Sequence, residues 1–188
     1  MSTIIVDEIS GTEGGNHVIG VPNNTTLYAP GHVIQTAWRK MDFHATYTAN
    51  NDNVSRDIEG LNIEFTPKKA TSQVLLQWWM FYESHYNITF QAKRNGNVIG
   101  FNSEVGNVRW SGITSAEYEH SWDLNSTPSY IHFSYVDTPG SVGPHLYSVG
   151  VRGSGGTNYQ IRMNRAWGSF GDSFEGGVSW CMIQEIAV

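Results

Sequence analysis

Residues 72–83 constrain the fold more than any other segment of the sequence. They read Ser-Gln-Val-Leu-Leu-Gln-Trp-Trp-Met-Phe-Tyr-Glu, a continuous run that is rich in apolar and aromatic side chains. A strand that is apolar at successive positions is typical of the middle of a sheet, where both faces are covered. We therefore expect residues 72–83 to form a central strand with both of its faces buried.

Segments before this run also have the pattern of strands. Residues 32–39 interleave large apolar and polar positions with residues that favour extended backbone. Leu61, Ile63 and Phe65 alternate with polar residues, which places three apolar side chains on one face. Pro67 has no backbone N–H to donate to a neighbouring strand, so we expect this strand to end there.

A two-residue turn is predicted at Asn95-Gly96. Both residue types tolerate positive φ, which the two-residue turns of β-hairpins require. Residues 87–94 and 97–101 flank the turn and have the composition of strands. We therefore expect these two segments to pair as a hairpin.

The second half of the chain continues the same pattern. Residues 130–136 and 145–152 alternate clearly, and a glycine-rich stretch at 153–157 joins the second of them to residues 158–163. We expect that connection to be another hairpin, and residues 177–188 to form the final strand. No window has a sustained 3.6-residue period with caps, so the fold class is all-β, with two antiparallel sheets.

The chain divides into a short arm and one domain. Residues 1–30 combine a brief apolar strand at 3–9 with a Gly- and Asn-rich linker, and such a segment buries little surface by itself. We expect residues 1–30 to be an arm for attachment and oligomerisation that a partner orders. Residues 31–188 then form a single β-sandwich, because 188 residues are too few for two ordinary domains.

Composition argues against two classes of partner. The formal net charge of −6 leaves no basic face to neutralise phosphates, so we expect no binding to nucleic acid. No stretch of about 18 apolar residues is present, so we expect no insertion into a membrane. Charged residues are 15% and aromatic residues 13% of the chain, a balance that suits a protein which buries surface against partners.

The sequence offers little support for catalysis. The seven histidines lack metal-binding spacings, and one cysteine cannot build a thiolate zinc site, so we expect no metal and no cofactor. A glycosidase needs two facing carboxylates. The pairs Glu117 with Glu119 and Asp172 with Glu175 are the candidates, but solvated loop acids explain them better. We expect the chain not to be an enzyme.

Aromatic residues in polar stretches are the candidate ligand-binding residues. They stand near Asp, Asn and Ser, a setting that is common where rings grip sugars or partner proteins. The alternative is that these rings cap the ends of the sandwich or fill an interface between copies. The candidates are Trp110, Tyr118, Trp122, Trp167, Phe170 and Phe174.

The sequence resembles the short tail-fibre and fibre-knob proteins on the virions of tailed bacteriophages, especially those that infect marine and photosynthetic bacteria. The resemblance spans most of the chain and lies in its pattern. It rests on the opening at 2–9, the entry into the domain at 29–35, the segment at 65–75 before the central strand, and the closing strands at 146–152 and 180–187. Trp180 and Cys181 depart mildly from the usual Met/Glu/Ile ending.

The resemblance implies a homotrimer of jelly-roll-like β-sandwiches on the virion surface. Its arm would dock on other virion proteins, namely the tail hub, the rest of a fibre or the capsid. Its distal loops would face a host surface receptor, expected to be a glycan. The apolar residues of the arm are the candidates for virion attachment: Ile4, Ile5, Val6 and Ile9.

Two other hypotheses remain open at this point. A capsid-decorating or head-fibre trimer would use the same arm to clamp the shell and would merely project its knob. A glycan depolymerase would require an acid pair in a groove, and the sequence lacks the long repetitive strands of β-helical tailspikes.

Overall fold

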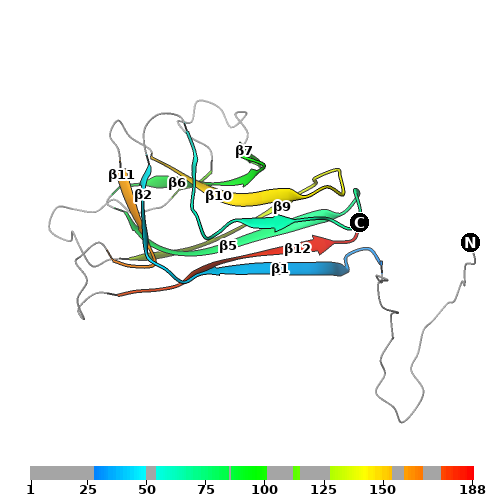
Figure 1. Ribbon diagram of the computed structural model, residues 1–188, viewed down its shortest axis with the longest axis horizontal. Coiled ribbons are helices and arrows are strands. Elements are labelled where there is room, and N and C mark those ends of the chain that lie inside the picture. The colour runs from blue at the N-terminus through cyan, green and yellow to red at the C-terminus, as the bar shows by residue number, and fades with distance from the viewer. Residues whose placement is uncertain are drawn as a thin grey trace, which may run out of the picture.

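The computed structural model describes residues 28–49, 54–84, 86–100, 112–114, 128–153, 159–166 and 175–188. Every regular element within these ranges is a β-strand, and none is a helix. The strands form two six-stranded sheets in which all pairings are antiparallel (Figure 1). The predicted all-β fold class is therefore confirmed.

The first sheet is built around β5, which pairs with β9 on one edge and with β12 and β11 on the other. β1 lies beyond β12, and β2 lies beyond β11. The strands of this sheet are β1 (Val33–Met41), β2 (Ala45–Ala49), β5 (Gln73–Ser84), β9 (Ser129–Asp137), β11 (Tyr159–Met163) and β12 (Ser179–Ile186).

The second sheet is built around β10 and β6. β10 pairs with β6 on one side and with β3 and β4 on the other, while β7 and β8 pair with the free side of β6. Its strands are β3 (Arg56–Asp57), β4 (Ile63–Phe65), β6 (Ile88–Arg94), β7 (Asn97–Val98), β8 (Ile113–Thr114) and β10 (His145–Gly153). The chain repeatedly crosses from one sheet to the other, as in a jelly-roll sandwich.

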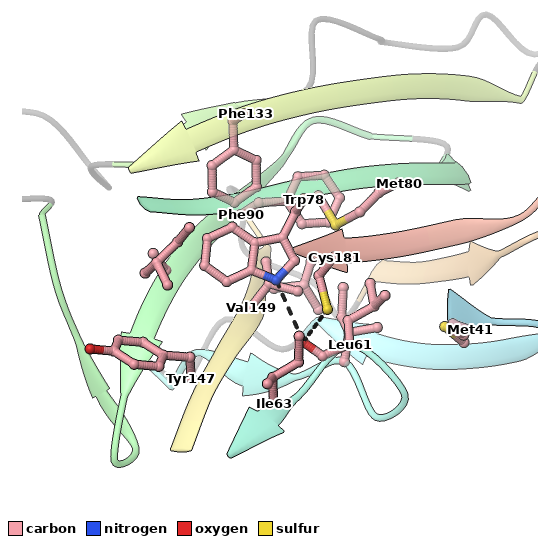
Figure 2. Close-up of a cluster of buried hydrophobic side chains, with 14 of the residues drawn as sticks. Met41, Leu61, Ile63, Trp78, Met80, Phe90, Phe133, Tyr147, Val149 and Cys181 are labelled. Atoms are coloured by element: carbon pink, nitrogen blue, oxygen red, sulfur yellow. Dashed lines mark hydrogen bonds between the residues drawn. The ribbon is translucent and has the colours of Figure 1, made fainter. Parts of the chain in front are cut away.

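The core fills the space between the two sheets, where every second side chain points inward (Figure 2). Trp78 of β5 is 1% exposed and stacks on Phe133 of β9 with ring centroids 5.0 Å apart. The Trp78 indole N–H donates to the Leu61 carbonyl oxygen over 3.5 Å, which satisfies its buried polar atom. Side chains of this size each stabilise the fold by about 1.5–3 kcal/mol through burial.

The sandwich has two ends, which we name for use below. The arm end holds residues 28–32, 66–72, 138–144 and 187–188, where β1 begins and β12 finishes. The far end lies where β5 finishes and β9 begins, with Ser129 paired to Tyr82. Figure 1 shows the C-terminus at one end, and β2 and β11 at the other.

Most of the predicted strands are confirmed. The central strand at 72–83, the alternating strand around Leu61–Phe65 and the closing strand after residue 177 all form close to the predicted places. Asn95 and Gly96 adopt φ of 52° and 81°, and the hairpin between β6 and β7 forms. Its second strand is only two residues long, shorter than the predicted 97–101.

Two predictions about pairing and burial were wrong. β10 and β11 do not form a hairpin, because β10 lies in the second sheet while β11 pairs with β2 and β5 in the first. β5 is not buried on both faces, since Leu75, Trp79 and Phe81 point outward and are only partly covered. No element packs over that face within the described part of the chain.

Glu185 ties together three segments at the arm end. Its side chain is fully buried, and its carboxylate accepts hydrogen bonds from the Gln35 amide at 2.6 Å and from the backbone N–H of Lys68 and Lys69 at 2.8–3.1 Å. A buried carboxylate is costly unless it is hydrogen-bonded. Here four hydrogen bonds compensate it and fix the loop before β5 against β12.

We expect Glu185→Gln to lower the free energy of unfolding by about 2–4 kcal/mol, because an amide NH₂ would face backbone donors in a buried site. Urea denaturation checks the value. Glu64→Gln, at an exposed position of β4, is the matched control and should change stability by about 0.5 kcal/mol or less. Equal effects of the two substitutions would contradict the role assigned to Glu185.

Cys181 gives a second prediction, on pH. Burial raises the pKa of its thiol from 9.0 to about 12. The unfolded chain therefore loses this proton at lower pH than the folded chain, so the stabilisation is complete below pH 9 and declines as pH rises toward 12. Wild type should lose up to about 1.4 kcal/mol per pH unit relative to Cys181→Ala. Parallel urea titrations from pH 8 to pH 11 measure it, and identical pH profiles would refute it.

Candidate functional site

The residues predicted from the sequence to bind a ligand lie outside the described residues. These are Trp110, Tyr118, Trp122, Trp167, Phe170 and Phe174. The same holds for the predicted attachment residues Ile4, Ile5, Val6 and Ile9. Their roles therefore stay predictions, and what can be established is where the described residues that flank them lie.

The residues that flank two of the ring-containing segments gather at the far end. Thr114, which precedes the segment with Tyr118 and Trp122, pairs with Thr89 at the start of β6. Ser129, just after that segment, pairs with Tyr82 near the end of β5. Arg165 and Gly176, on either side of the segment with the other three rings, form a bridge to each other.

A second group of aromatic rings lies on the outward face of the first sheet. Trp79 of β5 is the register partner of Trp180 on one side and of His132 on the other. Trp79 and Trp180 stack with centroids 3.7 Å apart and an interplanar angle of 4°, and His132 stacks on Trp79 at 4.5 Å. Three neighbouring strands thus contribute one column of rings, because register partners point to the same face.

We call the outward residues of β5 between positions 75 and 81, together with those of β9 and β12, the aromatic face. On the same side of the sheet, β5 continues to the buried Glu83, and Lys40 of β1 is the register partner of Trp180. The face consists of Leu75, Gln77, Trp79, Phe81, Tyr130, His132, Ser134, Val136, Trp180, Met182, Gln184 and Ile186.

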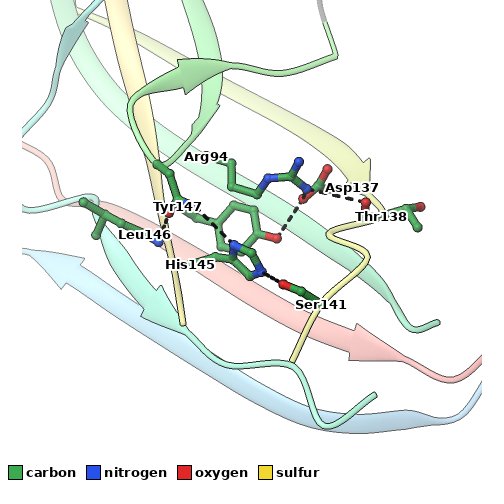
Figure 3. A network of polar contacts seen from close by, with 8 residues as sticks. Arg94, Asp137, Thr138, Ser141, His145, Leu146 and Tyr147 are labelled. Atoms are coloured by element: carbon green, nitrogen blue, oxygen red, sulfur yellow. Dashed lines mark hydrogen bonds and ion pairs between the residues drawn. The ribbon is translucent and has the colours of Figure 1, made fainter. Parts of the chain in front are cut away.

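A polar network lies on the other side of β9, close to the arm end (Figure 3). The buried Asp137 carboxylate accepts from the Arg94 guanidinium and from the Tyr147 hydroxyl, both at 2.7 Å. Burial, together with the neighbouring carboxylate, raises the pKa of Tyr147 well above its usual value. This phenol stays protonated, and the network joins β6, β9 and β10.

His145 belongs to the same region and meets Ser141 and Asn95. The Ser141 hydroxyl lies 2.9 Å from His145 Nε2, and the Asn95 amide nitrogen lies 3.3 Å from His145 Nδ1. A serine, a histidine and a third residue that orients the ring are the parts of a nucleophilic triad. The direction of each hydrogen bond decides whether this arrangement can act as one.

The hydrogen bonds give His145 the wrong tautomer for that chemistry. Asn95 Oδ1 accepts from the backbone N–H of Leu146 at 2.9 Å, so the amide NH₂ faces the ring and donates to Nδ1. A neutral imidazole that accepts at Nδ1 carries its proton on Nε2. Nε2 then donates to the Ser141 oxygen and cannot take its proton, so the three residues form a clamp on the loop before β10.

Other candidate chemistry is sparse in the described ranges. No three His, Cys, Asp or Glu side chains come together there as a possible metal site. No helix in those ranges is long and apolar enough to span a membrane. His132 and His145 both lie on strands, as expected from the sequence. The carboxylate pairs predicted for a glycosidase include residues 117, 119 and 172, which lie outside the described ranges.

The aromatic face is the feature that sequence reasoning missed. The continuous apolar run at 72–83 predicts burial on both sides, and this expectation gives no reason to look for a surface among its outward residues. The signal that could have found the face is alternation: Trp79 and Trp180 occupy positions that are out of phase with the core residues Trp78 and Cys181. A sheet with period 2 must place such neighbours on opposite faces.

The assigned tautomer of His145 can be measured directly. We expect two-dimensional ¹H–¹⁵N correlation spectra at neutral pH to give the Nε2–H form. Asn95→Asp replaces the donor at Nδ1 by a carboxylate acceptor and should move the proton to Nδ1. His132, far from this substitution, is the internal control. A wild-type protein in the Nδ1–H form would contradict the clamp and restore the triad as a candidate.

Comparisons with known proteins give few matches. No family model matches the sequence, and no curated protein matches it significantly. A solved structure of the Gx strain of infectious bursal disease virus contains a similar chain. The two share 11% identity with a TM-score of 0.34, over 96% of this chain and 46% of the viral chain. This chain therefore spans less than half the length of that viral chain.

Proposed function

We propose that this chain is a structural protein of a phage virion, a tail fibre or fibre knob that attaches at its arm end and binds a host receptor at its far end. The observation that carries the proposal is the separation of these two ends. Twelve residues of β5 run between them, which at about 3.3 Å per residue is a distance of roughly 40 Å.

The arm end supports attachment because the chain enters the domain at a fixed place. The Gly31 N–H donates to the Ala187 carbonyl over 2.8 Å, and the Ala187 N–H donates to the His32 carbonyl over 2.9 Å. The Lys69 ammonium lies 3.1 Å from the centroid of the Tyr28 ring, a cation–π contact. An arm that precedes Tyr28 therefore has a defined starting point.

The far end supports ligand contact because two of the segments with candidate rings start and finish there, and the segment with Trp110 finishes there. The three segments that contain Trp110, Trp122 and Trp167 are each flanked by a described residue of the far end. Loops that a rigid sandwich holds at one end are the usual place for binding residues. Weak contacts of such rings with a surface glycan would gain strength from several copies on one particle.

Location on the particle tests the proposal. We expect cryo-electron microscopy of virions that contain this chain to place it on the tail, with residues 1–30 toward the particle. Density on the capsid lattice would overturn the host-recognition function and make the chain a capsid-decorating protein.

Binding gives an independent test on purified protein. We expect Trp167→Ala and Trp122→Ala to weaken the binding of the full chain to host cells by about tenfold or more, because aromatic rings dominate such contacts. Trp38→Ala is the control, an exposed tryptophan of β1 away from the far end. Equal loss in all three variants would argue against a receptor site at the far end.

A further inference from the structure

The turn at Asn95-Gly96 has a chemical reactivity that its role in the hairpin does not use. An asparagine that is followed by glycine readily loses its side-chain ammonia, because glycine has no side chain to keep its backbone nitrogen away from the preceding amide carbon. Asn95-Gly96 is the one Asn-Gly pair in the sequence. Both residues are exposed, so water reaches the turn.

The turn also leaves room around the nitrogen that would attack. A Cβ placed on Gly96 would meet no described heavy atom within 4 Å, and φ at this residue is 81°. The backbone at Gly96 is therefore unobstructed on the side where other residues carry a side chain. Glycine also tolerates the change in backbone angles that the attack requires.

The Asn95 amide is held by groups that favour attack on its carbon. The Leu146 N–H donates to Oδ1 over 2.9 Å, and Oδ1 is the atom that gains negative charge when a nucleophile adds to the amide. The leaving nitrogen, Nδ2, lies 3.3 Å from His145 Nδ1. A histidine that is protonated at this nitrogen can pass the proton to the departing ammonia. The fold thus places a donor at the oxygen and a proton relay at the leaving group.

We propose that Asn95 is a site of self-modification, at which Leu146 and His145 assist deamidation and the aspartate product reverses the hydrogen bonds of His145. The Gly96 nitrogen forms a bond to Asn95 Cγ and gives up its proton. The Cγ–Nδ2 bond breaks, and ammonia leaves with that proton. Water then adds to Cγ, where the Leu146 N–H still polarises the oxygen, and the bond from Cγ to the Gly96 nitrogen breaks. The backbone regains its N–H, and position 95 becomes aspartate.

The product changes which nitrogen of His145 carries the proton. An amide NH₂ donates to Nδ1, whereas a carboxylate only accepts, so Nδ1 must now hold the proton. In the neutral ring Nε2 becomes the acceptor, and it faces the Ser141 hydroxyl at 2.9 Å. Ser141 then donates to the ring, as the serine does in a triad of aspartate, histidine and serine. Deamidation thus converts the clamp into an arrangement with a base directed at a serine.

This inference does not depend on the host-recognition function, because every residue in it lies in the hairpin between β6 and β7 or in the residues from 141 to the start of β10. It does rest on the Nε2–H tautomer assigned to His145 above. The two parts of the proposal, the reaction and the reversal, are tested separately.

The first test follows the reaction in the purified full chain, incubated at pH 8 and mapped by mass spectrometry. Asn97, exposed in the same hairpin, is the internal control. We expect Asn95 to become aspartate about tenfold or more faster than Asn97, because the branched Val98 side chain hinders its own backbone nitrogen. His145→Gln should slow the reaction of the folded chain by about tenfold or more and leave the rate in urea unchanged.

The second test reads the state of His145 in the product. Two-dimensional ¹H–¹⁵N spectra of the incubated protein should change from the Nε2–H form to the Nδ1–H form and match those of freshly made Asn95→Asp. If His145→Gln does not fold, Gly96→Ala takes its place in the first test. It adds a methyl group beside the attacking nitrogen and should also slow the reaction.

Each outcome decides for or against the proposal. Faster conversion at Asn95, slowed by the variant and followed by the change of tautomer, supports it. Three results overturn it: equal rates at Asn95 and Asn97, isoaspartate as the main product, or an aspartate product that keeps His145 in the Nε2–H form. A folded His145→Gln that reacts as fast as wild type also overturns it, because the reaction would then owe nothing to the fold.

Discussion

The structure depends on one constraint, the alternation of side chains along a strand that is paired on both edges. β5 holds β9 on one side and β12 and β11 on the other, so the register of the first sheet is set against it. Leu76, Trp78 and Met80 enter the core, while Leu75, Gln77 and Trp79 face outward. A slip of one residue would exchange these two sets, so the core and the aromatic face are two consequences of the same register.

The register of β5 does not determine how the loops at the two ends of the sandwich are held. Buried polar side chains hold them there by hydrogen bonds. Glu185 holds the loop before β5 at the arm end. At the far end, Asn164 adopts φ of 64° and its amide donates to the carbonyl oxygens of Met41 and Phe43 at 2.7 and 3.0 Å, while Ser179 donates to its oxygen at 2.7 Å. At both ends, satisfied polar groups fix the loops.

Local patterns in the sequence were sufficient to predict the strands but not their partners. Alternation at Leu61–Phe65 and the Asn95-Gly96 turn depend on neighbouring residues, and both formed as expected. β2, which reads Ala-Thr-Tyr-Thr-Ala, has too few apolar residues to be recognised and exists because β11 pairs with it. The tautomer of His145 depends on Asn95, a contact between residues 50 positions apart that no local pattern records.

The pairing of β1 with β12 has a kinetic consequence. Gln35 and Glu185, which lie side by side on these strands, are 150 positions apart in the chain, and β12 also supplies one neighbour of β5. Contacts of such long range make folding slow, because a large loop must close before they form. During synthesis, β1 and one edge of β5 must wait for the last described strand to emerge from the ribosome. Nascent chains of this protein thus expose unpaired strand edges until β12 has been synthesised, which makes them natural clients of chaperones.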